Sequence, residues 1–170
     1  MWQMFRQIFR VGLVSEAPPA PDGDLLQTQL HADIGRVFGR ALCIRHVDAG
    51  SCNGCELEIH ALNNPYYNLE GQGVRFVASP RHADALLVTG PVSRHMVEAL
   101  ERTYAATPDP KFVIAVGDCG ACGGVFGESY ACVGAVANVI PVDVTVRGCP
   151  PTPIALLQGI LSAIRARAAT

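Results

Sequence analysis

Short apolar runs alternate with helical patterns along the chain from residue 41 onward. Five runs rich in β-branched residues are strand candidates, at residues 41–48, 73–79, 83–90, 111–118 and 141–148. Three other stretches place their apolar side chains at helical spacing, at residues 53–63, 92–104 and 153–166. Several strand candidates are continuously apolar, as expected for strands that helices cover on both faces. The pattern predicts an α/β, flavodoxin-like three-layer sandwich with a mostly parallel sheet of about five strands.

The N-terminal segment has a different pattern. The apolar residues of MWQMFRQIFRVG share one helical stripe, which predicts a short amphipathic helix over residues 1–14. Residues 15–24 hold three prolines and one glycine and are typical of an extended linker. We therefore divide the chain into an amphipathic arm with its Pro-rich linker at 1–24 and one domain at 25–170. The arm is expected to fold back onto the domain, or to dock on a partner subunit or a membrane surface.

Composition excludes several functional classes. The chain has 170 residues, with 13 basic and 15 acidic side chains, so it has no basic field for nucleic acid. No apolar run approaches the roughly 18 residues that cross a bilayer. Neither a secretory nor a twin-arginine signal is present, and we expect a cytoplasmic, reducing location. Seven cysteines in that setting are candidates for metal ligation, redox chemistry or core packing rather than disulfides.

Five of the cysteines follow the ends of predicted strands. Cys52 and Cys55 come after the first strand, Cys119 and Cys122 after the fourth, and Cys149 after the fifth. In open parallel sheets, binding groups gather in the loops at the carboxyl ends of the strands. We therefore expect these five thiols to converge on one edge of the sheet.

The other two cysteines lie apart from this group. Cys43 falls inside the first predicted strand, and Cys132 lies in a stretch rich in alanine, valine and glycine. Free cysteine is among the most buried residue types and behaves as a small hydrophobic side chain. We therefore expect both residues in the core.

The convergent thiols allow two interpretations. The pairs Cys52-Asn-Gly-Cys55 and Cys119-Gly-Ala-Cys122 suit a tetrahedral zinc site, although their long separation is unusual for a small zinc module. The other interpretation is an iron-sulfur cluster bound by Cys52, Cys55, Cys119 and Cys149. Cys149 is followed by proline, which is typical of ferredoxin cluster ligands. Glycines crowd the loops of this set and allow the main chain to approach a bulky iron-sulfur cluster.

Four segments also carry a family resemblance. They are, in this order, SCNGCELEIHAL, SPRHADALLVTGPVSRHM, PKFVIAVGDCGACGG and VDVTVRGCPPTPIALLQGI. They resemble an electron-transfer subunit that two groups of enzymes share. In respiratory complex I, an NADH-quinone oxidoreductase, it is the 20 kDa subunit, and in nickel-iron hydrogenases it is the small subunit. The resemblance implies one 4Fe-4S cluster, held by Cys52, Cys55, Cys119 and Cys149. It leaves Cys122 unligated.

Two differences from these families indicate which type of small subunit the sequence resembles. The complex I subunit has two adjacent cysteines where this chain has Cys52-Asn-Gly-Cys55, and the split pair resembles the hydrogenase form. Uptake hydrogenases carry a twin-arginine signal and a further cysteine-rich domain, whereas no cysteine follows Cys149 here. The sequence is therefore most similar to the small subunit of membrane-bound, complex-I-related hydrogenases of the formate hydrogenlyase type.

This resemblance implies an electron-transfer subunit of an oxidoreductase complex that is not catalytic alone. The cluster would pass electrons between a hydrogenase large subunit, or the 49 kDa-like subunit of complex I, and a ferredoxin-like iron-sulfur subunit. The arm would contact membrane subunits and hold the chain on the inner face of the cell membrane. The first alternative is the corresponding component of a complex that passes electrons from NADH or another donor to quinone. The second is a zinc-binding structural module.

Three further residues are candidates for a role beside the cluster or at an interface: Glu58, Arg81 and Cys122. Glu56 and Glu58 are turned about 200° apart on a helix and cannot act as a carboxylate pair. The complex I subunit also has an acid three residues after its second cysteine, which favours Glu58 for a proton or interface role. Arg81 is expected to border a partner or to offset the cluster's charge, with a capped turn as the alternative. The histidines assigned no ligand role are His46, His60 and His95.

Overall fold

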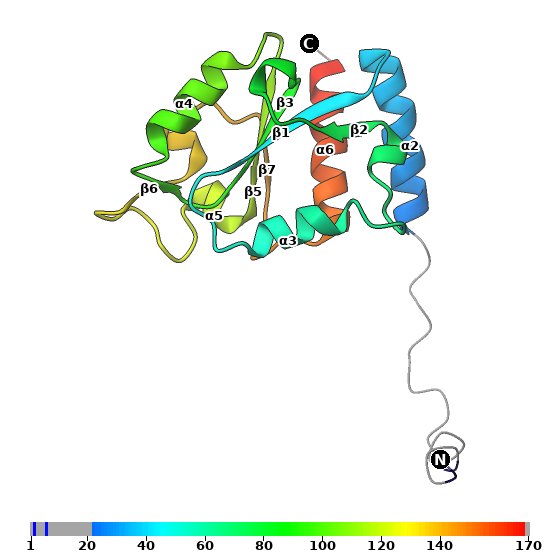
Figure 1. Cartoon of the computed structure of the whole chain (residues 1–170), viewed down its shortest axis with the longest axis horizontal. Helices are drawn as coiled ribbons and strands as arrows, with labels where there is room; N and C mark the ends of the chain where they lie inside the picture. Colours follow the sequence, from blue (N-terminus) through cyan, green and yellow to red (C-terminus); the bar gives the residue numbers. More distant parts are fainter. Residues whose placement is uncertain (1, 3–5, 7–21, 169–170) are drawn as a thin grey trace.

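A parallel sheet forms the centre of the computed structural model, which describes Trp2, Arg6 and residues 22–168 (Figure 1). The strands lie in the order β2-β1-β3-β5-β7, and every neighbouring pair is parallel. This is the strand order of flavodoxin-like sheets, which confirms the predicted fold class. The strands are β1 (Leu42–Asp48), β2 (Val74–Phe76), β3 (Ala85–Thr89), β5 (Phe112–Val116) and β7 (Val144–Val146).

Helices cover both faces of this sheet and give the fold three layers. Two long helices, α2 (Asp22–Phe38) and α6 (Pro153–Ala168), pack together on one face, and α4 (Val97–Ala106) covers the other (Figure 1). Two shorter helices, α3 (Gly54–Ala61) and α5 (Gly117–Cys122), lie at one end of the sheet. Short 3-10 turns connect these elements at η1 (Glu70–Gln72), η2 (Pro80–His82) and η3 (Val136–Asn138).

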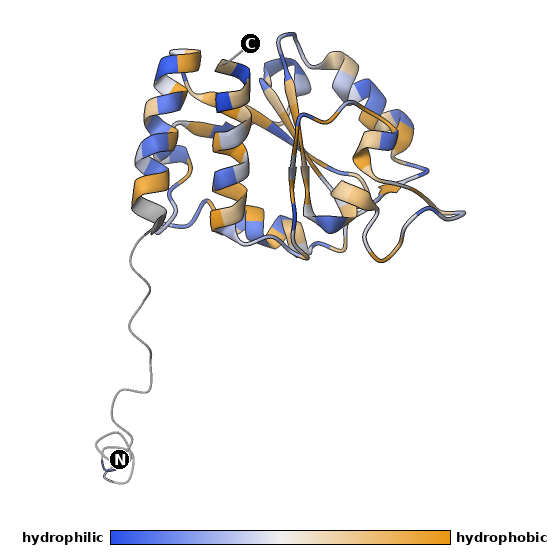
Figure 2. Cartoon of the chain, turned by 180° about the vertical axis from the view of Figure 1, so that it is seen from behind, coloured by the Kyte–Doolittle hydropathy of each residue, from blue (hydrophilic) through white to orange (hydrophobic). Residues whose placement is uncertain are grey.

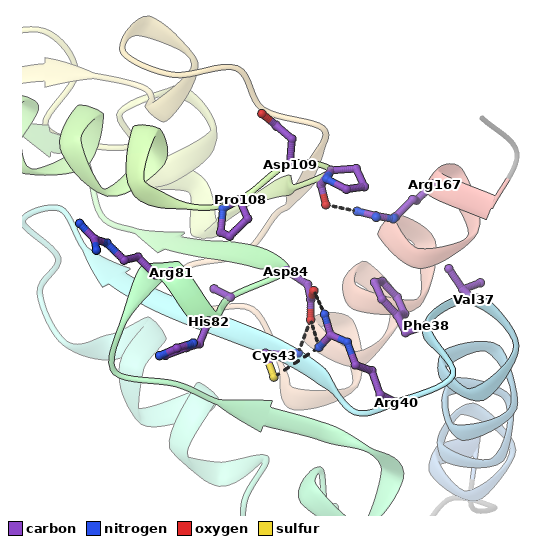
Figure 3. Close-up of a pocket in the computed structure, with 12 residues that line it drawn as sticks. Val37, Phe38, Arg40, Cys43, Arg81, His82, Asp84, Pro108, Asp109 and Arg167 are labelled. Carbon is purple, nitrogen blue, oxygen red and sulfur yellow. Dashed lines mark hydrogen bonds and ion pairs between the residues drawn. The ribbon is translucent and has the colours of Figure 1, made fainter.

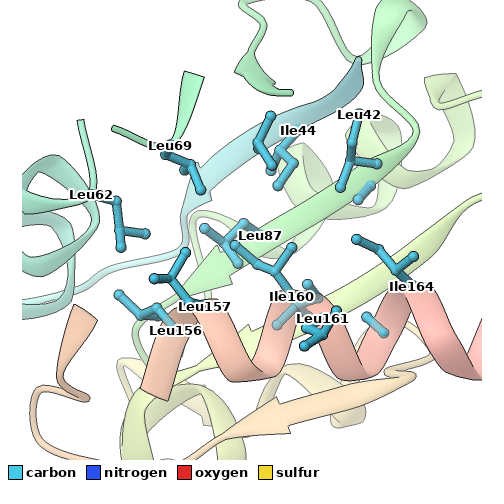
Figure 4. Close-up of a cluster of buried hydrophobic side chains, with 14 of the residues drawn as sticks. Leu42, Ile44, Leu62, Leu69, Leu87, Leu156, Leu157, Ile160, Leu161 and Ile164 are labelled. Atoms are coloured by element: carbon cyan, nitrogen blue, oxygen red, sulfur yellow. The ribbon is translucent and has the colours of Figure 1, made fainter. Parts of the chain in front are cut away.

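Alternate residues of the central strands enter two separate cores. Leu87 of β3 belongs to the core beneath α6, whereas Leu86 and Val88 belong to the core beneath α4. From α6, Leu157 and Ile160 pack toward the sheet (Figure 4). Because both faces of the sheet are covered, the central strands are hydrophobic along their length (Figure 2). This explains the continuous apolar runs in the sequence.

Helix α2 is an element that the sequence pattern did not predict. It begins at Asp22, inside the stretch interpreted as linker, and so before the predicted domain boundary. The available signal was the spacing of Leu26, Leu30 and Ile34, which share one helical face. Leu30 and Ile34 are buried in the core that α2 shares with α6. Frequent polar residues between them obscured the periodicity.

Two further segments differ from the sequence prediction. The helix expected over 92–104 begins at Val97, and Val92–Ser93 instead forms strand β4. Strand β4 pairs antiparallel with β6 (Cys132–Gly134) in a small second sheet. The GDCGAC segment, interpreted as a loop, forms the short helix α5.

The structure describes only two residues of the predicted amphipathic arm. Trp2 and Arg6 are both helical and exposed, and the rest of residues 1–14 lies outside the described residues. In the part of the chain that the structure describes, no helix has both the length and the apolar character to cross a membrane.

A glycine allows the close approach of α6 to β7, and replacing it should destabilise the domain. A Cβ at Gly159 would lie 2.2 Å from Cγ2 of Val146, whose branched side chain has little freedom to move. We expect Gly159→Ala to lower the free energy of unfolding by about 1–3 kcal/mol. Gly35 in α2 is the control, because a Cβ there meets no atom within 4 Å. Gly35→Ala should raise stability by about 0.5–1 kcal/mol in the same urea titration.

Candidate metal centre

Three loops bring cysteines to the carboxyl edge of the sheet, where α3 and α5 lie (Figure 1). Cys52 and Cys55 lie where the chain leaves β1 and enters α3, and Cys119 lies in α5, directly after β5. Cys149 lies between β7 and α6. The Cys55 thiol interacts electrostatically with the thiols of Cys119, Cys52 and Cys149. The structure therefore brings together the four residues that the resemblance implies as ligands.

Burial and mutual repulsion raise the pKa values of two of these thiols. For Cys55 the pKa rises to about 12, first because the thiol is buried and then because Glu56 and the other three thiols would repel its charge. The pKa of Cys119 is raised by burial and then by Cys149 and Cys52. A cationic centre would offset this repulsion when the thiols lose their protons, and metal binding at such a site releases protons.

Two hydrogen bonds tie the second and third cysteine loops together. The Asp118 amide donates to the Gly148 carbonyl over 2.9 Å, and the Gly148 amide donates to Oδ1 of Asp118 over 3.1 Å. Asp118 precedes Cys119, and Gly148 precedes Cys149. These two bonds hold the backbone next to Cys119 close to the backbone next to Cys149.

Glycines allow the main chain to pass close beside two of these thiols. A Cβ at Gly117 would lie 2.7 Å from Sγ of Cys55, and a Cβ at Gly124 would lie 2.8 Å from Sγ of Cys119. Both glycines have positive φ, at 80° and 56°, which other residues adopt only with strain. The main chain here can approach a bulky group bound to the thiols, as the donor set of a sulfur-ligated cluster requires.

Cys122 has hydrogen-bond partners outside the four converging thiols. Its Sγ accepts a hydrogen bond from Nη1 of Arg147 over 3.5 Å and donates to the Asp118 carbonyl over 3.3 Å. The side chain is exposed, and it lies close enough to Cys119 to contribute to that residue's raised pKa. These contacts give Cys122 its own partners beside the site.

The four thiols do not meet at a single point. Among Trp2, Arg6 and residues 22–168, no three His, Cys, Asp or Glu side chains gather closely enough to hold one metal ion. A 4Fe-4S cluster is a larger group than a single metal ion, and four cysteine thiolates would hold it. The donor chemistry and the close approach of the glycine backbone to the thiols are the features that fit such a cluster.

Glu56, rather than Glu58, is the buried carboxylate of this site. Its side chain is 7% exposed, and Oε2 accepts a hydrogen bond from the Ser51 hydroxyl over 2.6 Å. Glu58 is only partly buried, and a role for it at an interface stays a prediction. Their spacing in the sequence correctly predicts that the two acids lie on different faces of α3, but it does not predict which of them is buried.

A cavity of about 310 Å³ opens beside Glu56, between β1, α3 and the chain after β2. His46 lines it, with Nε2 3.1 Å from the Thr89 hydroxyl and 3.7 Å from Oε1 of Glu56. Within the described residues, Oε1 of Glu56 and Nε of Arg45 are buried without a hydrogen-bond partner. Both atoms belong to residues that line this one cavity.

The histidine of this cavity should make stability depend on pH. Burial lowers the pKa of His46 from 6.5 and outweighs the opposing attraction of Glu56. The unfolded chain therefore binds a proton more readily, so the free energy of unfolding should fall as the pH drops below about 6.5. We expect His46→Gln to reduce that fall in urea titrations between pH 7 and pH 5, relative to the exposed control His82→Gln. An unchanged pH dependence would contradict the assignment.

Arg81 lies at the opposite end of the sheet from the four converging cysteines. It lines a cleft of about 620 Å³ together with Cys43, Asp84 and Pro110, which lie at the starts of β1, β3 and β5 (Figure 3). Here Arg40 forms two hydrogen bonds to Asp84, at 2.6 and 3.0 Å. This location does not support a role for Arg81 in offsetting the charge of a cluster. A role at an interface stays a prediction.

The two cysteines expected in the core are only partly buried. Cys43 lines the same cleft, with Sγ 3.9 Å from Nη1 of Arg40 (Figure 3). Cys132 lies in β6, in the small second sheet outside the main one. The prediction failed for Cys43 because it lies on the opposite face of β1 from the buried Leu42 and Ile44 and lines the cleft. It failed for Cys132 because β6 belongs to a separate two-stranded sheet and not to the central one.

Comparisons with known proteins give consistent matches. Residues 52–163 match the family model of the 20 kDa subunit of NADH ubiquinone oxidoreductase. The chain is 49% identical over 133 residues to a probable membrane-bound hydrogenase subunit, mbhJ, of Pyrococcus furiosus, covering 78% of this chain and 80% of that protein. It is 43% identical over 135 residues to formate hydrogenlyase subunit 7 of Escherichia coli, covering 79% of this chain but only 53% of that protein.

One solved structure gives a similar result. A chain of the membrane-bound sulfane sulfur reductase, an archaeal respiratory membrane complex, aligns with a TM-score of 0.66 and 33% sequence identity. The alignment covers 80% of this chain and 74% of that chain. The similarity therefore holds in both sequence and three-dimensional structure. The complexes that contain these similar proteins are named for different reactions.

Proposed function

Because this chain belongs to the family of the 20 kDa subunit of NADH ubiquinone oxidoreductase, whose relatives are subunits of oxidoreductase complexes, we propose that it is the electron-transfer subunit of a membrane-associated nickel-iron hydrogenase complex related to complex I. It carries one 4Fe-4S cluster on Cys52, Cys55, Cys119 and Cys149. The observation that carries the proposal is the convergence of these four thiols from three strand ends, with glycines beside them.

The residues of this chain hold and position the cluster, which when bound supplies one-electron redox chemistry. The paired hydrogen bonds of Asp118 and Gly148 fix two of the ligand loops. Burial of Cys55 excludes water from one side of the site. The more exposed thiols, Cys52 and Cys149, mark the side from which a partner approaches.

Exposed apolar side chains on the elements of this edge support a protein partner. Val125 is 94% exposed and Tyr130 is 95% exposed, both in the loop that follows α5. Phe126 of the same loop and Leu57 of α3 are 57% and 61% exposed. Large exposed apolar residues beside a functional site are typical of an interaction surface. We assign this surface to the large subunit, which must lie close to the cluster to exchange electrons with it.

The partners distinguish the proposed function from its alternatives. Under this proposal, the full chain purified from its source without oxygen brings with it a large subunit that contains nickel and two Cys-x-x-Cys pairs. It also brings a ferredoxin-like iron-sulfur subunit and membrane subunits, which hold the complex on the inner face of the cell membrane. A nickel-free large subunit that reduces quinone would instead indicate the quinone oxidoreductase alternative.

A metal assay tests the second alternative. Four irons and four acid-labile sulfides for each chain, with a brown colour, are expected for the cluster. One zinc and no sulfide would overturn the proposal in favour of a structural module.

A further inference from the structure

The loop that carries Cys52 and Cys55 lacks the usual support at a helix start. Helix α3 has eight residues, and its N-cap, Asn53, has a left-handed conformation with φ of 72° and makes no side-chain capping bond. An N-cap side chain normally satisfies one of the free amides of the first turn. The segment between the two cysteines must therefore be held by other contacts.

Those contacts come from a pair of side chains that span the loop, Ser51 and Glu56. The Ser51 hydroxyl donates to Oε2 of Glu56 over 2.6 Å and accepts from the Asn53 amide over 3.1 Å. Ser51 directly precedes Cys52, and Glu56 directly follows Cys55. The bond between them, here called the Ser51–Glu56 clip, closes the loop around both thiols.

The clip is also anchored to the sheet. The Ser51 amide donates to Oδ1 of Asp48, the last residue of β1, over 2.7 Å. On the other side, Oε1 of Glu56 faces His46 Nε2 at 3.7 Å, beyond hydrogen-bond distance, and His46 in turn contacts Thr89 of β3. The bond to Asp48 therefore holds the loop against β1.

The burial of Glu56 is not explained by stability alone. The side chain is only 7% exposed, and Oε1 has no hydrogen-bond partner among the described residues. A carboxylate oxygen left in this state costs folding free energy. A buried polar atom without a partner calls for an explanation, and a role at a functional site is one such explanation.

We propose that Ser51 and Glu56 are positioning residues that hold Cys52 and Cys55 at the spacing that the cluster requires. The inference rests on the proposed cluster and adds to it two residues that are not ligands. The hydroxyl and the carboxylate act through their hydrogen bond. Variants that keep the bond should therefore keep the geometry.

Matched variants of the full chain, purified without oxygen, test this proposal. Ser51→Ala and Glu56→Ala remove the bond, whereas Ser51→Thr and Glu56→Gln keep a donor or an acceptor in place. Glu101→Gln, on the exposed face of α4, controls for the loss of a charge. The measurements are the rate of iron loss to a chelator and the line shape of the reduced cluster in electron paramagnetic resonance spectra.

We expect Ser51→Ala and Glu56→Ala to lose iron about tenfold faster, because a hydrogen bond to a charged group is lost. Their spectra should change, while Ser51→Thr, Glu56→Gln and the control resemble the unmodified chain. If Glu56→Ala fails to fold, Ser51→Ala carries the test. If Ser51→Ala loses iron at the wild-type rate and has the wild-type line shape, this inference is overturned and the proposed function is not. An unmodified chain that binds no iron and sulfide would overturn the proposed function and the inference with it.

Discussion

Replacing Cys149 with serine should abolish the cluster, whereas replacing Cys122 should leave it in place. Cys149 lies in the loop that two hydrogen bonds tie to the Cys119 loop, and its thiol interacts with both Cys55 and Cys119. Cys122 instead contacts Arg147 and the Asp118 carbonyl. A cluster that loses one of four thiolates lacks a ligand for one iron, and we expect iron and sulfide to fall to near zero in Cys149→Ser.

The pair of variants also controls for general damage to the site. Both residues are exposed cysteines at the same edge of the sheet, and both changes replace sulfur with oxygen. Iron and sulfide assays and the visible absorption spectrum of each variant give the measurement. A cluster-free Cys122→Ser with a normal Cys149→Ser would show that the ligand set is Cys52, Cys55, Cys119 and Cys122, as in the zinc interpretation.

The backbone arrangement of this site was predictable because it depends on strand order. Each parallel strand delivers its following loop to the same edge of the sheet, so the positions of Cys55, Cys119 and Cys149 after three apolar runs were sufficient to predict that they converge. The pattern of apolar residues showed the five strands because both faces of the sheet are buried. Helix α2 was missed because only one narrow face of it is buried.

Side-chain contacts within the loops were not predictable in the same way. Helical angle places Glu56 and Glu58 on different faces, but the left-handed Asn53 sets how α3 begins and therefore which face turns toward Ser51. Sequence spacing does not encode that turn. Likewise, Arg81 follows β2 in sequence, but the short turn η2 returns the chain to the start of β3 rather than to the cysteines.

The glycine at the start of α5 should be nearly as sensitive as a cysteine ligand. Gly117 has φ of 80°, and a Cβ there would lie 2.7 Å from Sγ of Cys55 and 3.4 Å from the Gly148 carbonyl oxygen. Alanine at this φ costs about 1–2 kcal/mol, and overpacking costs about 1–3 kcal/mol more. We expect Gly117→Ala both to destabilise the chain and to displace Cys55, so that iron and sulfide content falls severalfold.

Gly39 separates these two effects, because it has φ of 62° but a Cβ there would meet no atom within 4 Å. Gly39→Ala should show the conformational cost alone, about 1–2 kcal/mol in urea unfolding, with full iron and sulfide content. Gly117→Ala should exceed that cost and lose the cluster under conditions where its circular dichroism spectrum is still native. Equal stability and equal iron content in the two variants would mean that the close contact between the Gly117 backbone and the Cys55 thiol does not set the position of that thiol.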